Sequence, residues 1–157
     1  MTPLAAATAS GDDSLGHVLL HGSGALLAYA AVGLVLFVAG FYMIDLATPG
    51  RLIHVIRRDR NPNATLLACA STVGVGLIVA VSIFAAGGDL AEGLTRTLVF
   101  GLVGIVAQTA ATMAFNRLVG INVRELADGP EDGLEPAAIL LGVANLMIGF
   151  VIAVAVY

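Results

Sequence analysis

Charge is scarce in this chain of 157 residues, since 11% of the residues are charged, against about 25% in a typical soluble domain. Lysine is absent, and all 7 basic residues are arginine. The one cysteine, Cys69, lies within an apolar run, which excludes an intrachain disulfide framework and a multi-cysteine metal cluster. The net charge of -4 argues against nucleic-acid binding. The sequence therefore excludes a soluble globule, a disulfide scaffold and a nucleic-acid-binding protein.

Long apolar runs take the place of the missing charge. Hydrophobic residues make up 59% of the chain, and the mean hydropathy is +0.98. A bilayer core needs about 20 apolar residues as helix, and four runs satisfy this: roughly 25–46, 64–86, 96–117 and 137–157. The runs are continuous rather than alternating, which favours helices over a barrel. We predict an all-α polytopic membrane protein with four transmembrane helices.

The arginines predict how the chain is oriented. Six of the seven lie in the linkers after the first and third runs, and only Arg96 borders the linker at 87–95. By the positive-inside rule, the two arginine-bearing linkers are cytoplasmic, and the 87–95 linker and both termini are extracytoplasmic. The segment 1–23 has no basic residue, so we expect an extracytoplasmic arm rather than a signal peptide.

The first cytoplasmic linker has the pattern of an interfacial helix. Thr48-Pro49 is a good helix start, and apolar residues then alternate with arginines that we expect at anionic lipid headgroups: Arg51, Arg57, Arg58 and Arg60. Asn61-Pro62-Asn63 ends this helix, and we expect Asn63 to cap the second span. Leu118, Ile121 and Leu126 predict a weaker helix in the third linker.

The two halves of the chain resemble each other. The segment GLVLFVAG from Gly33 matches GLVGIVAQ from Gly101, and aligning Asn63 with Pro136 matches the second helices to the end of the chain. We therefore predict two-helix repeat units at 24–86 and 96–157. Both begin outside, so they are parallel repeats about a pseudo-twofold axis along the membrane normal.

The sequence also resembles a known family, the bacterial inner-membrane proteins of domain of unknown function 350 (YjfL-like). The resemblance covers roughly residues 25–157 and rests on short motifs: Asp45, Thr48-Pro49, Ile53, Asn63, Ala64, Gly74 and Gly76. The second unit departs from the pattern because its linker has no Thr-Pro. The resemblance implies a bacterial inner-membrane protein in which a two-helix unit occurs twice, and it implies no established activity.

Polar side chains within apolar runs are costly and mark candidate sites. Gln108, Thr112 and Asn116 recur every four residues on one helical face. Asn145 lies near the middle of the fourth run, opposite Thr72 in the repeat alignment, and Ser71 is next to Thr72. These groups are interpreted in two ways. They form either interhelical hydrogen bonds that fix packing or the lining of a pathway for an ion or small solute.

Other residues are assigned to packing and pairing. Asp45 has Arg51 or Arg117 as its candidate ion-pair partner on the cytoplasmic side. Small residues predict close helix packing at Gly74, Gly76, Gly142 and Gly149. Four helices leave little room for a wide pathway within one chain, so we expect a homo-oligomer.

The sequence contains no convincing catalytic, cofactor or metal site. His17 and His21 share a helical face without a third ligand. Cys69 is expected to be inert packing, and no nucleophile lies near a histidine. We therefore predict a non-enzymatic structural or accessory component of the bacterial inner membrane, in contact with the lipid bilayer. The alternative is a small oligomeric channel or permease.

Overall fold

The computed structural model describes residues 3–47, 61–121, 126 and 133–157, with the backbone alone for 3–14 and 47. Helix is the only regular structure in these residues: α1 (Pro3–Ala47), α3 (Pro62–Phe84), α4 (Leu90–Val119) and α6 (Pro136–Val156). All four are long and apolar enough to cross a membrane. The prediction of an all-α chain with four transmembrane helices is confirmed.

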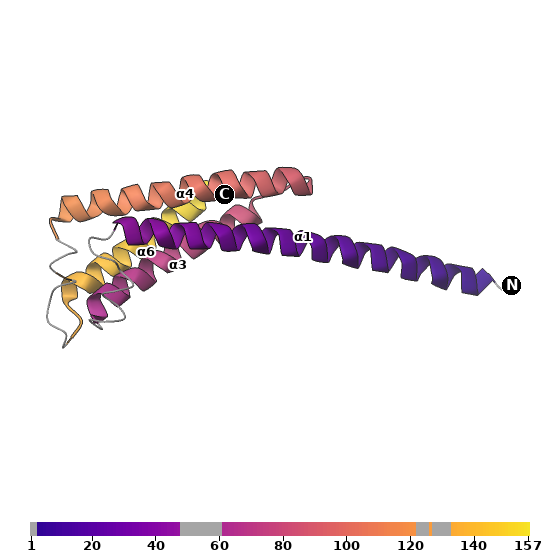
Figure 1. Ribbon diagram of the computed structural model, residues 1–157, viewed down its shortest axis with the longest axis horizontal. Helices are drawn as coiled ribbons and strands as arrows, with labels where there is room; N and C mark the ends of the chain where they lie inside the picture. Colours follow the sequence, from indigo (N-terminus) through magenta and orange to yellow (C-terminus); the bar gives the residue numbers. More distant parts are fainter. Residues whose placement is uncertain (1–2, 48–60, 122–125, 127–132) are drawn as a thin grey trace.

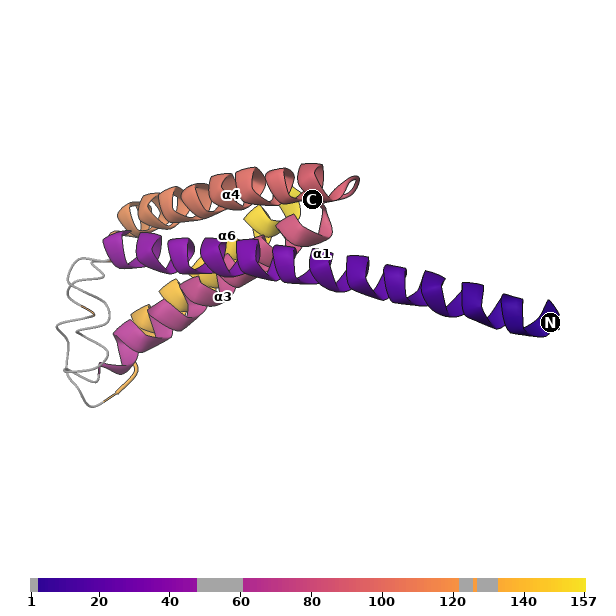
Figure 2. The ribbon, with the colours of Figure 1, turned by 45° about the vertical axis from the view of Figure 1, so that its right-hand side comes forward.

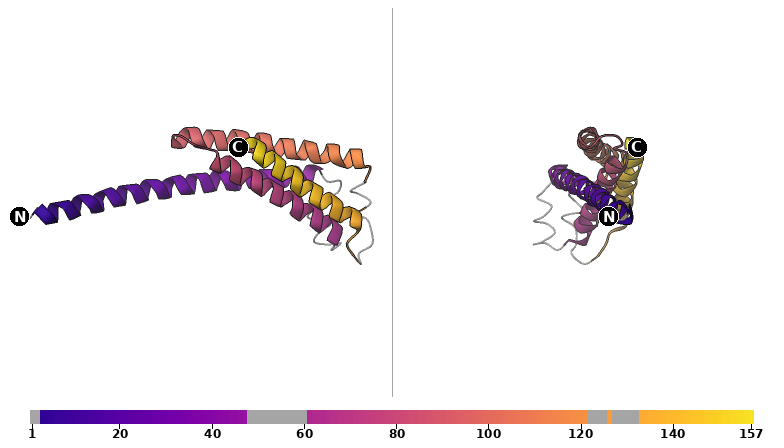
Figure 3. Two further views of the ribbon diagram at one scale, coloured as in Figure 1. Left: turned by 180° about the vertical axis from the view of Figure 1, so that it is seen from behind. Right: turned by 90° about the vertical axis from the view of Figure 1, so that its right-hand side faces the viewer.

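The helices form a bundle of two parallel pairs, and the two pairs run in opposite directions. In Figure 1, α1 and α4 run in one direction, and α3 and α6 run obliquely in the opposite one. The same relation holds after rotation, in Figure 2 and in the left view of Figure 3, where α3 and α6 lie side by side. One end of the bundle carries the connection from α3 to α4 with Asp89 and Glu92, and we call it the acidic end.

The core has α3 at its centre. The most extensive contact between helices joins α3 to α6, and α3 also contacts α1 and α4. One apolar cluster joins Leu36 of α1 and Ile105 of α4 to two valines of α3. A second cluster lies toward the other end of the bundle, where Leu67 packs with Leu141 and with Leu126 from the connection between α4 and α6.

Helix α1 is much longer than the predicted first span. It begins at Pro3 and continues through the segment expected as an arm, and its apolar part alone runs over Leu15–Leu46. Those 32 residues measure about 48 Å as helix, whereas a bilayer core is about 30 Å thick. The N-terminal part of α1 therefore projects past the other helices, as Figures 1 and 3 show.

The start of α3 corrects one expectation. Asn61, not Asn63, is the N-cap, because its Oδ1 accepts from the backbone N–H groups of Asn63 at 2.8 Å and Ala64 at 3.1 Å. Pro62 takes the first helical position, where its missing N–H costs no hydrogen bond. Asn63 is thereby freed to reach α6, and its Oδ1 accepts from the backbone N–H of Glu135 at 2.8 Å.

The other connections also differ from expectation. The linker predicted at 87–95 is shorter, because α4 already begins at Leu90 with Asp89 as its N-cap. Leu118 belongs to α4 rather than to a separate helix. Leu126 is helical, 4% exposed and packed in the bundle, and the rest of the weaker helix predicted around it lies outside the described residues. The predicted interfacial helix at Thr48–Arg60 lies outside the described residues.

The two halves share a burial pattern. The buried positions Gly33, Leu36 and Gly40 of α1 lie 68 residues before buried positions of α4. Each of the six buried positions of α6 lies 74 residues after a buried position of α3. This register pairs Pro62 with Pro136, one residue away from the alignment of Asn63 with Pro136. The duplication itself stays a prediction.

Candidate functional site

Three buried polar side chains meet in the middle of the bundle, one from each of three helices. Ser71 of α3, Gln108 of α4 and Asn145 of α6 are 7%, 3% and 4% exposed. The Gln108 amide nitrogen Nε2 donates to the Ser71 backbone carbonyl at 3.1 Å. The Asn145 amide nitrogen Nδ2 donates to Ser71 Oγ at 3.2 Å. We call these three residues the polar centre.

Glycines make this meeting possible. The backbones of Gly74 in α3 and Gly149 in α6 are in direct contact, so a Cβ on Gly149 has no space. A Cβ on Gly74 would lie 2.5 Å from Gln108 Nε2 and 3.2 Å from Gly149 Cα. Small residues allow backbones to approach where lipid offers no hydrophobic force between helices. The polar centre is consequently packed against bare backbone on this side.

The polar centre leaves two oxygens unpaired. Gln108 Oε1 and Asn145 Oδ1 are buried and accept no hydrogen bond from any described residue. A buried acceptor without a donor is costly, by about 1–3 kcal/mol. The two atoms of the polar centre that remain available to a ligand are therefore uncharged oxygens. They suit a hydrogen-bond donor such as water, and they suit a small cation less well because the polar centre has no carboxylate.

Three of the predicted polar residues do not join the polar centre. Thr112 and Asn116 continue the Gln108 face of α4 away from the acidic end, and both are partly buried. Thr72 is one position along from Ser71, which turns its side chain about 100° round the helix. No hydrogen bond among the described residues links these three side chains to Ser71, Gln108 or Asn145.

The remaining predicted glycines differ in their surroundings. A Cβ on Gly142 would lie 3.3 Å from Leu66 of α3, which is a tight contact. A Cβ on Gly76 would meet only Phe37, at 3.8 Å, so this position has room for a side chain. Close approach therefore depends on Gly74 and Gly149, and Gly76 is not required for it.

The predicted ion pair is only partly described. Asp45 is half-buried near the end of α1, and Arg117 is exposed in the last turn of α4. The predicted headgroup contacts Arg51, Arg57, Arg58 and Arg60 lie outside the described residues. The pairing of Asp45 with Arg51 or Arg117 and the headgroup contacts stay predictions.

Two polar contacts were missed from the sequence. Thr97, fully buried, donates to the Ser82 backbone carbonyl at 3.3 Å and ties α4 to the end of α3. Asn61 Nδ2 donates to the Leu126 backbone carbonyl at 3.3 Å, which holds the connection between α4 and α6 against α3. The signal for Thr97 was its place in the series Gly93, Thr97, Gly101, a small-residue stripe at four-residue spacing.

The candidate metal and thiol groups lie on exposed surfaces. The rings of His17 and His21 stack with centroids 4.5 Å apart on the projecting part of α1. No group of three metal-ligating side chains occurs among the described residues. Cys69 is exposed on the outside of α3, so its expected role in packing was wrong.

Four apolar helices joined by glycine contacts and buried amides define this chain as a four-helix transmembrane protein. The family described as Domain of Unknown Function (DUF350) matches residues 17–156, and the chain belongs to this family. It is 32% identical over 138 residues to a UPF0719 transmembrane protein of Mycolicibacterium paratuberculosis, covering 88% of this chain and 90% of the relative. It is 37% identical over 137 residues to a UPF0719 transmembrane protein of Mycobacterium bovis, covering 87% and 89%. No solved structure matches this chain.

Proposed function

We propose that this protein is a structural or accessory component of the bacterial inner membrane, without enzymatic activity, whose own helix bundle is closed to solutes. The observation that supports this most directly is the backbone contact of Gly74 with Gly149 directly beside the polar centre. A water-filled pathway needs separation between helices at mid-depth, and a backbone contact leaves none between α3 and α6. The hydrogen bonds of Gln108 and Asn145 to Ser71 fit a packing role.

Thiol accessibility tests this proposal. In a Cys69→Ser background, single cysteines replace Gln108, Thr112 and Asn145, and labelling by a membrane-impermeant maleimide is measured in intact and denatured protein. We expect no labelling in the folded protein and full labelling after denaturation. Labelling of Gln108→Cys or Asn145→Cys in folded protein would contradict a closed bundle.

A matched control uses Thr95, which is exposed at the acidic end of α4. Thr95→Cys should label in folded protein, which shows that the reagent works near the bundle. The same variant tests orientation in intact cells. We propose that the acidic end and both termini are extracytoplasmic, so Thr95→Cys should label from outside. Labelling only after the membrane is opened would reverse the proposed orientation.

One observation favours the second candidate, a small channel or permease. The unpaired Gln108 Oε1 and Asn145 Oδ1 offer acceptors to a solute or ion in a homo-oligomer with a wider arrangement of helices. Flux of monovalent cations into liposomes would support this candidate if it disappeared in Gln108→Leu. Equal leakage from wild type and Gln108→Leu would remove it. Native mass spectrometry of the same samples would test the homo-oligomer.

A further inference from the structure

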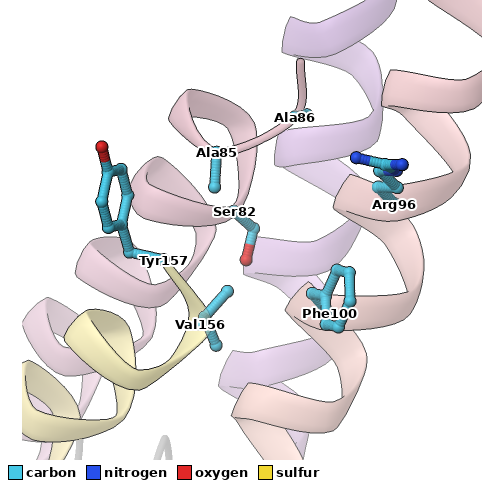
Figure 4. A pocket seen from close by; sticks show the side chains of 7 residues that line it. All are labelled: Ser82, Ala85, Ala86, Arg96, Phe100, Val156 and Tyr157. Carbon is cyan, nitrogen blue, oxygen red and sulfur yellow. The ribbon is translucent and has the colours of Figure 1, made fainter. Parts of the chain in front are cut away.

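A small pocket opens at the acidic end of the bundle, where three helices converge. It has a volume of about 160 Å³ and lies between Ser82 and Ala86 of the α3 end, Arg96 and Phe100 of α4, and the last residues of α6 (Figure 4). The lining residues at the end of α3, which are Ser82, Ala85 and Ala86, have small side chains, and this leaves the space open. The pocket is separate from the polar centre, none of whose three residues lines it.

The pocket is held in place by a contact between its walls. Thr97, directly after Arg96, donates to the backbone carbonyl of Ser82 at 3.3 Å, and both residues are buried. Ser82 Oγ in turn donates to the Ile78 carbonyl of its own helix at 2.8 Å. The backbones that carry Arg96 and Ser82 are therefore fixed relative to each other, although the pocket itself lies at the edge of the bundle.

The lining combines one cation with an apolar floor. The Arg96 guanidinium has five N–H donors, and Glu92 takes a hydrogen bond from Nη2 at 2.6 Å, with both side chains about half exposed. Arg96 makes no other hydrogen bond among the described residues. Phe100 follows one helical turn deeper and faces Val156 across the pocket (Figure 4).

The depth of Arg96 places this pocket at the membrane surface. Between Arg96 and Arg117, α4 contains 20 residues without a charge. As helix they span about 30 Å, the thickness of the hydrocarbon core. Arg96 consequently lies at the level of lipid headgroups, and Phe100 lies at the level where acyl chains begin.

We propose that this pocket binds the phosphate group of a membrane phospholipid, with Arg96 donating to the phosphate oxygens and the glycerol end of the lipid lying against Phe100 and Val156. Guanidinium groups recognise phosphate through paired, charge-assisted hydrogen bonds. The apolar floor distinguishes a lipid from free phosphate, because a soluble anion gains nothing from Phe100 and Val156. This site is distinct from the arginine-bearing linkers, which follow the first and third apolar runs in the sequence.

The test is a titration of the full chain in detergent with short-chain phosphatidylglycerol, followed by native mass spectrometry. Loss of a charge-assisted contact should raise the Kd of Arg96→Gln by about tenfold or more. Glu92→Gln should lower the Kd, because the competing carboxylate is gone while the arginine stays. Ala86→Leu should raise the Kd by filling the pocket with the charge of Arg96 unchanged. Thr95→Ala, an exposed neighbour outside the pocket, should bind like wild type.

Several results would overturn the proposal. If Arg96→Gln binds the lipid like wild type, the guanidinium does not hold the phosphate. If Ala86→Leu keeps its thermal unfolding transition and binds like wild type, Arg96 acts as an ordinary surface charge and the pocket is not the site. If inorganic phosphate displaces the lipid at equal concentration, the site takes a free anion and the apolar floor has no role.

Discussion

Glycine brings helices together in two different ways in this bundle. Between α3 and α6, Gly74 and Gly149 face each other, so that backbone touches backbone. Between α1 and α4, glycine faces a large side chain: a Cβ on Gly101 would lie 2.6 Å from Leu36 Cδ1, and Gly93 lies under the Tyr29 hydroxyl. We call the backbone-to-backbone contact of α3 with α6 the flat contact. We call the contact in which a side chain of α1 occupies the space over a glycine of α4 the notch contact.

The difference determines how each contact responds to change. A side chain in a notch can change rotamer when the notch is filled, whereas two backbones can only separate. Helices in lipid associate through van der Waals packing and interhelical hydrogen bonds rather than through a hydrophobic force. At the α3–α6 contact both contributions coincide, because the bond from Asn145 to Ser71 lies one turn from the Gly74–Gly149 contact. We therefore expect α3–α6 to be the less tolerant contact.

The largest expected effect comes from adding one methyl group at the flat contact. Gly149→Ala places a Cβ against the Gly74 backbone, and we expect the free energy of unfolding to fall by about 3 kcal/mol, at the upper end for overpacking. Steric trapping in bicelles would measure it. The control is Gly76→Ala, two residues along α3 and facing Phe37 of α1, which has room for the methyl group and should leave stability equal or slightly higher. Equal losses in both variants would remove the distinction between the two glycines.

The notch contact can be tested from the side-chain partner. Leu36→Ala empties the space over Gly101, and we expect a loss of about 2 kcal/mol, at the lower end for a buried leucine because lipid is as apolar as the core. Leu34→Ala, 65% exposed on the same helix, should stay within about 0.5 kcal/mol. A loss at Leu36 larger than that of Gly149→Ala would reverse the order of the two contacts.

The hydrogen bond at the α3–α6 contact should contribute less than its packing. A double-mutant cycle with Asn145→Ala and Ser71→Ala isolates the bond between the two side chains, and we expect a coupling of about 0.6 kcal/mol, typical of hydrogen bonds between membrane helices. The same unfolding assay provides all four measurements. A coupling near zero would assign the stability of this contact to the glycines alone.

The smallest effect is expected at the acidic end, outside both contacts. Glu92→Gln breaks the ion pair with Arg96. The side chain of Arg96 is 52% exposed and that of Glu92 is 56% exposed. Solvent screening limits such a pair on one helix to less than about 0.5 kcal/mol. The free energies of unfolding of wild type and Glu92→Gln should therefore differ by less than about 0.5 kcal/mol at low salt and be equal within error at high salt. A large loss would indicate that the charge supports the α1–α4 contact from a distance.

The number of spans was predictable because lipid demands long apolar runs, but the packed faces were not. In a soluble helix the polar side identifies the buried side. In α3 and α6 nearly every face is apolar, so nothing in the sequence distinguished Ser71 from Thr72, and the shared burial pattern differs by one residue from the predicted alignment of the halves. Asn63 was expected to cap the second span, yet Asn61 is the cap, and Asn63 instead accepts from the backbone N–H of Glu135, 72 residues away.

The starting point of α1 was missed for a related reason. Leu15, Val18, Leu19 and Leu20 extend the apolar run, but the lack of a basic residue over 1–23 was interpreted as an extracytoplasmic arm. This part of the chain also holds Gly16, Gly22 and Gly24 and is nevertheless helical. A Cβ on any of these glycines would meet no atom within 4 Å, so none of them is required for a close approach. Gln108 and Asn145 could be singled out from the sequence because polar residues in apolar runs are rare, whatever face they occupy, and both donate to Ser71 in the structure.

The hydrogen bond from the Glu135 backbone N–H to Asn63 has a consequence for biogenesis. Its two residues belong to the second and fourth spans, so α3 enters the membrane long before its main partner has been synthesised. Until α6 follows, Ser71 lacks its bond with Asn145 and the backbone of Gly74 lacks Gly149, although Gln108 of α4 is already present. The α3–α6 contact can therefore form only after α6 has been synthesised, and a chain that stops before Pro136 leaves the Gly74 backbone without its Gly149 partner.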